Sequence, residues 1–558
     1  MKKILLITLS LCICTWCGFS QQLAVKQIQL LTKVGIKKAY PASIRMWAFD
    51  TVKNQQAGPQ FSAVVVTSDG HILTAAHVNT PGQTYMVTFP SGKTCIAQGL
   101  GKIEYEQTPM MPDVAMMRII TPGKWPYAEM GWSSTIKINE PVISISYPES
   151  LNQPLPLVRF GSVTNLKNEY GFLQSTCMME PGDSGGPVFD YLGRVIGLHS
   201  AINGDVDYEV PVDLYRKYWT ALNLQKVYPT LPEHEDSIGN DPIKVMSFPQ
   251  LASLNKNFFK TAELFAGNVV SIESTDADKS QQVLGTLIKS SKLTYIISKS
   301  SLIGANPIVK LVDGKTISAK VLYRDKNTDL ILLEPVIKIK GGINLSTFVK
   351  DTLNSNQLGD FLISVLPDTK DTEVSVIGST KFSLNKVAAM PFLGAAVAYK
   401  QPVEITVIQP GSPAANAGLQ VGDQVVSIDS AAIHKPENYG DQLIKYWKGD
   451  TIKFDVIRQG NRISNQIVLS SRPERPITHP ADLFKGGKSN RRDGFENVFV
   501  QSTRIKPEQC GGPVIDMMGN FYGINIARFS RTSTIVTPAS VILSFINASL
   551  TFNNNNNL

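Results

Sequence analysis

The segment MMEPGDSGGPVFD (178–190) is the part of the sequence from which the fold is predicted. Glycines and a proline surround Ser184 there, a composition typical of a tight turn that presents a nucleophile. Further along the chain, RIKPEQCGGPVID (504–516) keeps the GGPV frame but has Cys510 at the position of Ser184. We therefore expect a duplicated domain, with one intact and one altered copy of this turn.

The sequence blocks around the two turns repeat in the same order. In the first copy they lie at 61–78, 112–119, 160–166 and 171–202, and in the second at 284–303, 328–335, 377–382 and 498–527. Most blocks are short β-branched and aromatic runs between Gly, Pro, Asn or Asp, as in antiparallel barrels. The predicted fold class is therefore mostly β.

The spacing of the blocks predicts an insertion in the second copy. His77 lies 107 positions before Ser184, whereas its equivalent, Ser301, lies 209 positions before Cys510. The other blocks agree in spacing, so the extra 102 residues must lie after 377–382, where the first copy has only a hairpin turn. A loop whose ends are already close can hold a whole domain at little entropic cost.

Three residues of the first copy match the needs of acyl transfer by serine, namely a nucleophile, a general base and a carboxylate that orients the base. His77 ends ILTAAHV, Asp113 begins DVAMMRI, and Ser184 lies in GDSGGPV. A histidine after a strand and an aspartate before one are each common as structural residues. Their order together with the GDSGGP motif favours a catalytic triad, with the N–H groups of Gly182 and Ser184 as the oxyanion hole.

The insertion contains PFLGAAVAYKQPVEITVIQPGSPAANAGLQVGDQVVSIDS (391–430) and resembles a PDZ domain of the kind found in bacterial proteases. The alternative is another small β domain. The resemblance implies that a peptide carboxylate binds at a loop formed by Phe392, Leu393, Gly394 and Ala395.

The first copy resembles a chymotrypsin-fold serine protease, and its combination with a PDZ domain and an export signal is similar to the HtrA/Deg family. This implies two chymotrypsin-like double β-barrel domains, the second carrying the PDZ domain as an insertion. The family normally has one protease domain, whereas this chain has two copies. At the nucleophile turn the family usually has Gly-Asn-Ser, whereas this chain has Asp183 in the middle position. No activation cleavage site is evident, so the partner of Asp183 is left open.

The resemblance also implies the position of the specificity pocket. Its wall is expected near Met178 and along the strand His199, Ser200 and Ala201. No acid is evident at the base of this pocket, so we expect a small or medium apolar residue before the scissile bond rather than Lys or Arg. His199 has an equal alternative as a core residue.

The second copy has lost the residues that the reaction needs. Ser301 replaces the base, Asp329 remains without an imidazole to orient, and Glu508 brings a charge to the position of Gly182. Cys510 is intrinsically a better nucleophile than serine, but without a base it should be inert. We interpret the second copy as a degenerate protease domain.

The N-terminus, MKKILLITLSLCICTWCGFS (1–20), has two lysines, an apolar run and a small-residue cleavage pattern, as in a secretory signal. An uncleaved anchor or a lipoprotein at Cys17 is a weaker alternative. Cys95 and Cys177 either form a disulfide or remain separate buried thiols. The net charge of +8 comes without a basic helix, so nucleic-acid binding is not expected.

The expected domains are a signal peptide (1–20), an active protease domain (23–222), a linker (223–262), a degenerate protease domain (263–385 and 490–548), a PDZ domain (386–475) and a disordered tail (549–558). We predict an exported, ATP-independent serine endopeptidase, periplasmic or secreted, that cleaves unfolded or C-terminally exposed proteins. The PDZ domain would bind C-terminal peptides, and the second copy would regulate or scaffold.

The alternative function is a peptide-binding holdase that does not cleave, although the intact triad counts against it. Neither a metal nor an organic cofactor is expected, nor is stable membrane insertion. Members of the family often trimerise through N-terminal segments, so a homo-oligomer formed through 23–50 is a further expectation.

Overall fold

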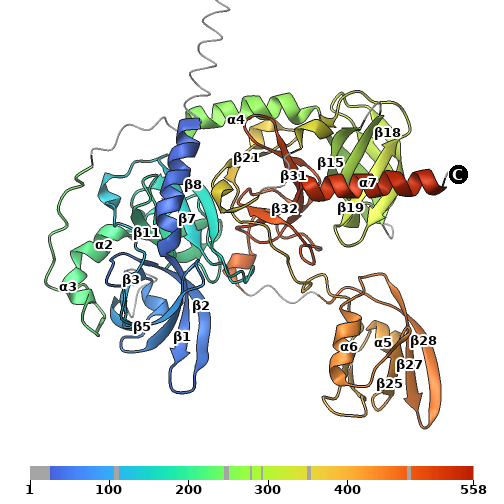
Figure 1. Cartoon of the computed structure of the whole chain (residues 1–558), viewed down its shortest axis with the longest axis horizontal. Coiled ribbons are helices and arrows are strands. Elements are labelled where there is room, and N and C mark those ends of the chain that lie inside the picture. The colour runs from blue at the N-terminus through green and yellow to red at the C-terminus, as the bar shows by residue number, and fades with distance from the viewer. Residues whose placement is uncertain are drawn as a thin grey trace, which may run out of the picture.

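The computed structural model describes residues 26–105, 112–243, 251–276, 279–290, 293–348, 353–473 and 479–556. Two β-barrel units lie side by side, and a smaller β domain lies beside the second unit (Figure 1). The prediction of a mostly β fold is confirmed. The predicted signal at 1–20 lies outside the described residues.

The first unit begins with a closed barrel. Its strands are β1 (Ser43–Asp50), β2 (Gln55–Val65), β3 (His71–Thr74), β4 (Thr84–Thr88), β5 (Thr94–Ile103), β6 (Val114–Ile119) and the short β13 (Val227–Tyr228). Pairing between β5 and β6 closes the ring. In β5 every second residue is buried, as period-two alternation on a one-sided strand requires.

The second half of this unit is a six-stranded sheet in the order β12-β11-β10-β7-β8-β9. Its strands are β7 (Pro141–Ser146), β8 (Leu157–Asn165), β9 (Gln174–Ser175), β10 (Pro187–Phe189), β11 (Val195–Asn203) and β12 (Val206–Pro211). All six residues of β7 are buried, which explains its continuous apolar and serine sequence. Helices α2 (Val212–Lys217) and α3 (Trp219–Leu222) follow.

The second unit repeats this order of pairing except at one edge strand of its six-stranded sheet. Its closed sheet contains β14 (Val269–Asp276), β15 (Lys279–Ser290), β16 (Leu293–Lys299), β17 (Ala305–Lys310), β18 (Thr316–Asp325), β19 (Leu330–Pro335) and β20 (Ile343–Asn344). Its six-stranded sheet contains β21 (Phe361–Ser364), β22 (Val374–Val376), β29 (Phe499–Gln501), β30 (Pro513–Ile515), β31 (Phe521–Arg528) and β32 (Thr534–Pro538). The smaller domain lies in sequence between β22 and β29.

The two units share one hydrophobic core. The Val158 N–H on β8 donates to the Gly378 carbonyl at 2.9 Å, and the rings of Phe160 and Phe361 lie 5.0 Å apart. The N-terminal helical residues 26–39 also join the units, because Lys33 pairs with Asp360 at 2.7 Å. The two six-stranded sheets therefore meet in an extensive apolar interface.

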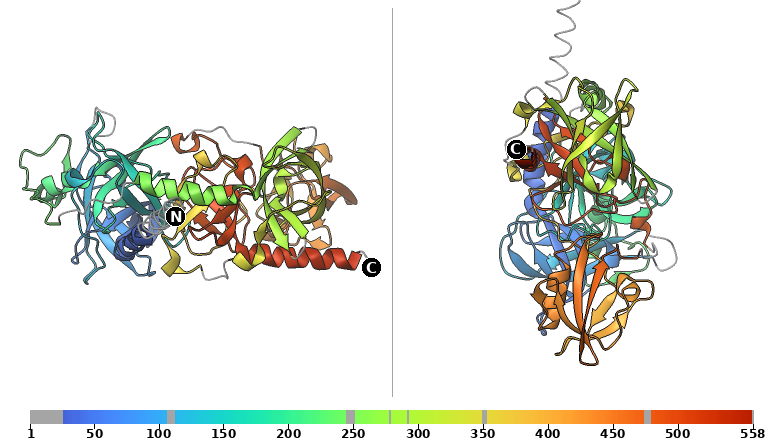
Figure 2. Two further views of the ribbon diagram at one scale, coloured as in Figure 1. Left: turned by 90° about the horizontal axis from the view of Figure 1, so that it is seen from above. Right: turned by 90° about the vertical axis from the view of Figure 1, so that its right-hand side faces the viewer.

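Two helices lie along the units. Helix α4 (Leu251–Ala266), in the expected linker, packs on β21, where Phe258 contacts Phe361. Helix α7 (Ala539–Asn556) extends along the second unit away from the first (Figure 2). The structure thus continues a helix into the tail that the sequence predicted to be disordered, with Phe552 packed against Tyr323.

The smaller domain has its own core. It contains β23 (Ala395–Val397), β24 (Ile405–Ile408), α5 (Pro413–Asn416), β25 (Gln424–Ile428), β26 (Ala431–Ala432), α6 (Pro436–Leu443), β27 (Thr451–Arg458) and β28 (Asn461–Val468). Arg491 lies over the Trp447 ring, 3.9 Å from its centroid, and connects this domain to the second unit.

No helix in the described ranges is long and apolar enough to cross a membrane. Cys95, Cys177 and Cys510 are buried free thiols, so the structure contains no Cys95–Cys177 disulfide.

Candidate active site

The turn that carries Ser184 is held against the strands that lead to His77. The Ser62 N–H on β2 donates to the Ser184 carbonyl at 3.0 Å, and the Gly185 N–H donates to the His199 carbonyl at 2.7 Å. Gly185 has a φ of +74°, and a Cβ there would overlap Thr74 at the end of β3. Only glycine permits this close approach, which brings the turn beside the short helix η2 (Ala76–Val78).

His77 and Asp113 lie as a general base and its orienting carboxylate should. The Asp113 Oδ2 atom lies 2.8 Å from His77 Nδ1, and its Oδ1 accepts the His77 backbone N–H at 2.9 Å. The Ser200 hydroxyl donates to Oδ2 at 2.6 Å. Among the described residues Asp113 is the one hydrogen-bond partner of the ring, so Nε2 makes no hydrogen bond with the Ser184 hydroxyl in this structure and its lone pair is available to a proton.

Burial and charge act in opposite directions on this pair. Burial lowers the pKa of His77, but the hydrogen bond and charge of Asp113 raise it above its usual value. Burial raises the pKa of Asp113, but the bonds from His77 and Ser200 lower it below its usual value. Asp113 is therefore ionised at neutral pH and stabilises a protonated imidazole.

Two backbone N–H groups near Ser184 are available to an oxyanion. Gly182 has a φ of +94°, the left-handed region that favours glycine. Within the described part of the chain, neither the Gly182 N–H nor the Ser184 N–H has a hydrogen-bond acceptor. Unpaired donors at a nucleophile turn are what a developing negative charge requires.

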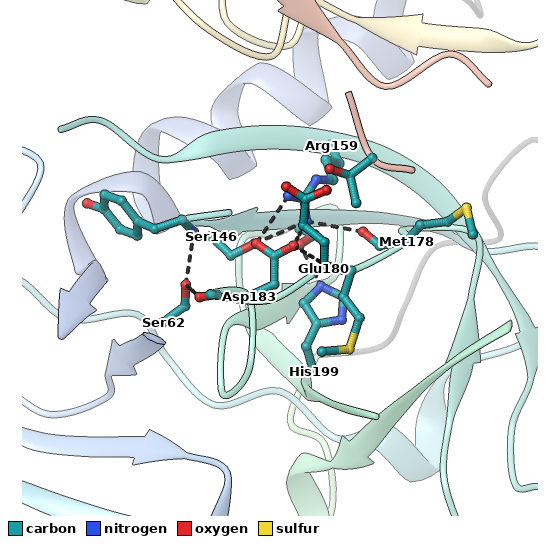
Figure 3. A network of polar contacts seen from close by, with 12 residues as sticks. Ser62, Ser146, Arg159, Met178, Glu180, Asp183 and His199 are labelled. Atoms are coloured by element: carbon teal, nitrogen blue, oxygen red, sulfur yellow. Dashed lines mark hydrogen bonds and ion pairs between the residues drawn. The ribbon is translucent and has the colours of Figure 1, made fainter. Parts of the chain in front are cut away.

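Asp183, the residue whose partner the sequence left open, pairs with Arg159 on β8 (Figure 3). The Arg159 Nη1 lies 2.9 Å from Asp183 Oδ2, and both side chains are at most 1% exposed. Arg159 also donates to the Met178 carbonyl at 3.1 Å. Asp183 accepts the Ser146 hydroxyl at 2.8 Å and the Glu180 N–H at 2.9 Å. An internal cation thus fixes the turn without a newly cleaved N-terminus.

The residues predicted for the specificity pocket do not form one open wall. His199 is fully buried and its Nε2 lies 2.8 Å from the Ser144 hydroxyl, which fits the core alternative. Burial lowers the pKa of His199 to about 3, so the ring is neutral. Ser200 is also buried and supports Asp113, whereas Ala201 is partly exposed.

A cavity of about 240 Å³ lies between the two units. Met178 lines it from the first unit, and Glu373, Arg504 and Arg531 line it from the second. Of the four residues predicted for the specificity pocket, Met178 alone is among those that line this cavity.

Sequence reasoning missed an acid next to the predicted pocket. Asp207 on β12 is buried and accepts the Met179 N–H at 2.6 Å. Burial raises its pKa to about 6, although Arg531 of the second unit opposes this shift. Alternating polar residues in VDYEV (206–210) suggest an exposed strand, yet both Asp207 and Glu209 are buried. Asp207 is thus a buried acid next to Met179, and the expectation that no acid lies at the base of the pocket stays a prediction.

The corresponding site in the second unit is closed. The Lys299 ammonium pairs with Asp329 at 2.6 Å, and the Ser301 hydroxyl donates to the same carboxylate at 2.9 Å. Cys510 is fully buried, which raises the pKa of its thiol, and its N–H donates to the Pro507 carbonyl at 3.2 Å. The thiol is thus protonated at neutral pH, and the N–H matching that of Ser184 is already used.

The loop predicted to bind a peptide carboxylate has free donors. The N–H groups of Leu393 and Gly394 find no acceptor among the described residues, and Gly394 has a φ of +80°. The Tyr439 hydroxyl on α6 donates to the Ala395 carbonyl at 2.7 Å and positions the start of β23 beside the helix. This geometry leaves a donor-lined position between β23 and α6.

Two domain families match the chain. The family described as a trypsin-like peptidase domain matches residues 61–198, and the family described as a PDZ domain matches residues 387–469.

Several curated relatives align at low identity. The probable periplasmic serine endoprotease DegP-like of Bartonella henselae is 22% identical over 68% of this chain and 69% of its own length. The protein of the same description from Hahella chejuensis is 23% identical over 73% of this chain and 80% of its own. The putative serine protease HhoA of Synechocystis sp. is 27% identical over 29% of this chain and 42% of its own.

Proposed function

Because the chain belongs to the HtrA/Deg family of serine endopeptidases with a PDZ domain, we propose that Ser184, His77 and Asp113 form its catalytic triad. The observation that carries this assignment is the His77–Asp113 contact of 2.8 Å beside a turn whose Gly182 and Ser184 N–H groups have no acceptor among the described residues. The substrates would be polypeptides.

The proposed reaction follows from these groups. His77 Nε2 takes the proton of the Ser184 hydroxyl as its oxygen attacks the scissile carbonyl carbon. The carbonyl oxygen becomes an oxyanion that the N–H groups of Gly182 and Ser184 stabilise. The protonated His77 then gives its proton to the leaving amine, and a water molecule releases the acyl group by the same steps. Asp113 stabilises the imidazolium throughout.

A fluorophosphonate probe tests this proposal, because it labels only a serine that is activated as a nucleophile. We expect the wild-type protein and the Cys510→Ala variant to be labelled equally, and Ser184→Ala to lose labelling and casein cleavage together. Cys510 is the matched control because it occupies the corresponding turn of the second unit. Labelling that persists in Ser184→Ala, or that disappears in Cys510→Ala, would contradict the proposal.

We also propose that the PDZ domain binds C-terminal peptides through the loop formed by Phe392, Leu393, Gly394 and Ala395. The support is the pair of N–H groups at Leu393 and Gly394, which have no acceptor in the part of the chain that the structure describes, and the bond from Tyr439 of α6 to the adjacent Ala395 carbonyl. A chain end bound there would hold a polypeptide substrate near the protease unit by raising its effective concentration.

Gly394→Ala should lower the affinity for a peptide with a free C-terminal carboxylate by at least about tenfold, or 1.4 kcal/mol. The added Cβ would overlap Ser412 and the φ of +80° would be strained. Gly411→Ala is the matched control, since Gly411 has a φ of +70° but open space around it. Fluorescence anisotropy with free and amidated peptides measures the effect. Equal affinities for both peptides would refute carboxylate binding.

We propose that the second unit is a degenerate protease domain that carries the PDZ domain as an insertion. The support is that its strands pair in the same order as those of the first unit, except that β29 pairs with β32 where β9 pairs with β8, while the equivalents of His77 and Ser184 are Ser301 and Cys510. Its role would be structural and regulatory, through contacts with the active unit. We further propose that the protein is exported. The support is that the relatives from Bartonella henselae and Hahella chejuensis carry the description of probable periplasmic proteases.

A further inference from the structure

We propose that Arg531, a residue of the second unit, is a positioning residue of the active site in the first unit. Through Asp207 it holds the backbone at Met179 and thereby the oxyanion-hole residue Gly182. This inference rests on the proposed function, because it concerns the catalysis assigned to Ser184. It gives the second unit a defined task in the reaction although it lacks chemistry of its own.

Arg531 lies in the turn between β31 and β32, and its side chain is completely buried against the first unit. Its Nη1 lies 3.0 Å from Asp207 Oδ1, and its Nη2 donates to the Gly204 carbonyl at 2.9 Å. The contact with Asp207 is an ion pair rather than an aligned hydrogen bond. The other oxygen of Asp207 accepts the Met179 N–H at 2.6 Å. A guanidinium, a carboxylate and a backbone amide thus stand in series.

The segment 179–183 transmits this constraint to the oxyanion hole. The Asp183 N–H donates to the Glu180 carbonyl at 2.9 Å, and the Glu180 N–H donates to the Asp183 carboxylate at 2.9 Å. These two bonds close a short turn around Gly182. Any displacement of Met179 therefore moves Gly182, whose N–H must point at the oxyanion to be effective.

Two buried arginines hold this turn. Arg159 of the first unit binds the Met178 carbonyl and the Asp183 carboxylate (Figure 3). Arg531 of the second unit holds Met179 through Asp207. Arg159 holds both ends of the turn, the Met178 carbonyl at its beginning and the Asp183 carboxylate next to Ser184, whereas Arg531 acts through Asp207 on the Met179 N–H of the same peptide group. The first unit alone supplies only one of these two constraints.

Arg531 is not needed to shape its own turn, because Arg528 already does so. The Arg528 guanidinium donates to the Thr503 carbonyl at 2.8 Å and to the Arg531 carbonyl at 2.5 Å. These contacts stay within the second unit. The side chain of Arg531 makes its polar contacts with Asp207 and Gly204 of the first unit.

Electrostatics makes Asp207 dependent on Arg531. Asp207 is 1% exposed, and the nearby charge of Asp183 further disfavours its ionised form. A buried carboxylate without a cation is strongly unfavourable, so it either takes up a proton or leaves its position. Either response weakens the acceptor that holds the Met179 N–H. Burial also raises the pKa of the neighbouring Glu180, and the Ser530 hydroxyl of the second unit is among the groups that oppose this shift.

The test compares Arg531→Met and Arg531→Lys in the full-length protein, using a chromogenic peptide and a peptide boronic acid that mimics the transition state. We expect Arg531→Met to lower kcat by at least about tenfold with little change in KM. The affinity for the boronic acid should fall by a similar factor, since both need a placed oxyanion hole. Arg531→Lys, which keeps the cation, should recover part of the loss.

Arg504→Met is the matched control. Arg504 lines the same cavity between the units but pairs with Glu373 inside the second unit. We expect its kcat to equal that of the wild type, with the melting temperature recorded for every variant. If Arg504→Met loses as much kcat as Arg531→Met, the effect is general loosening of the interface and the inference is wrong.

The double variant Arg531→Met with Asp207→Asn keeps the test valid if Arg531→Met folds poorly. It removes the unpaired charge but retains an oxygen acceptor for the Met179 N–H, so it should be more active than Arg531→Met alone. The inference is overturned if the losses of activation free energy in the single variants Arg531→Met and Asp207→Asn simply add in the double variant. It is also overturned if kcat is unchanged in Arg531→Met. A wild-type protein without Ser184-dependent cleavage would instead refute the proposed function itself.

Discussion

Replacing Asp113 with Asn should lower kcat by about 10⁴-fold while the protein remains folded. Asp113 accepts hydrogen bonds from the His77 ring, the His77 backbone and the Ser200 hydroxyl. An amide nitrogen facing Nδ1 would favour the tautomer in which Nε2 carries the proton, so the ring could no longer accept the proton of Ser184. Steady-state kinetics on a peptide substrate measures the change.

The second unit supplies the control for this prediction. Asp329→Asn alters the corresponding carboxylate, which pairs with Lys299, and should leave kcat unchanged below the melting temperature. A loss of less than about tenfold in Asp113→Asn would show that Asp113 does not orient the base.

The pH dependence of kcat/KM tests the interaction between His77 and Asp113 independently. Only the neutral imidazole can accept a proton, so kcat/KM should fall as the pH drops through the pKa of His77. Because Asp113 raises that pKa, the midpoint of the wild-type acid limb should lie above 6.5. In Asp113→Asn burial remains and the charge is lost, so the midpoint of the residual activity should move down.

Arg159→Met should be the most destabilising single substitution near the active site, with a loss of about 3–5 kcal/mol in the free energy of unfolding. It leaves the fully buried Asp183 carboxylate without its cation. It also removes the donor to the Met178 carbonyl, so the turn that carries Gly182 loses an anchor. We expect kcat to fall by about 10²–10³-fold, as when an oxyanion-hole donor is lost. Denaturant unfolding and steady-state kinetics measure the two effects.

A second substitution should restore much of this loss. Asp183→Asn in the Arg159→Met background removes the unpaired charge and gives the Gly-Asn-Ser sequence that is usual in the family. We expect the double variant to be more stable and more active than Arg159→Met. If it is equally impaired, the ion pair does not explain the role of Arg159.

The sequence carried enough information to predict the turn at Ser184, the positions of His77 and Asp113 and the PDZ domain. These signals are local, because a nucleophile turn needs glycine at fixed positions and a repeated barrel repeats its pattern. In the structure His77 lies against Asp113 and the Gly182 N–H has no acceptor among the described residues, which supports the roles proposed for them.

The missed residues depend on contacts between distant segments. Arg159 lies in the apolar run LVRF (157–160). A charged residue within an apolar strand was the one sequence signal that Arg159 is buried and pairs with a buried acid. Asp207 and Arg531 lie 324 positions apart, and the segment SRTST (530–534) reads as an exposed loop although all five residues are buried. Local pattern cannot show that one loop covers another unit.

The shared core of the two units also has a genetic consequence. A unit that packs its apolar sheet against a catalytic neighbour cannot be deleted without exposing the surface that it covers. Substitutions such as those at Phe361 would therefore reduce the amount of active enzyme although they lie far along the chain from Ser184. Selection for protease activity therefore also acts against substitutions that destabilise the second unit. A domain that has Cys510 and Ser301 at the positions of Ser184 and His77 can thus be retained for as long as its neighbour is needed.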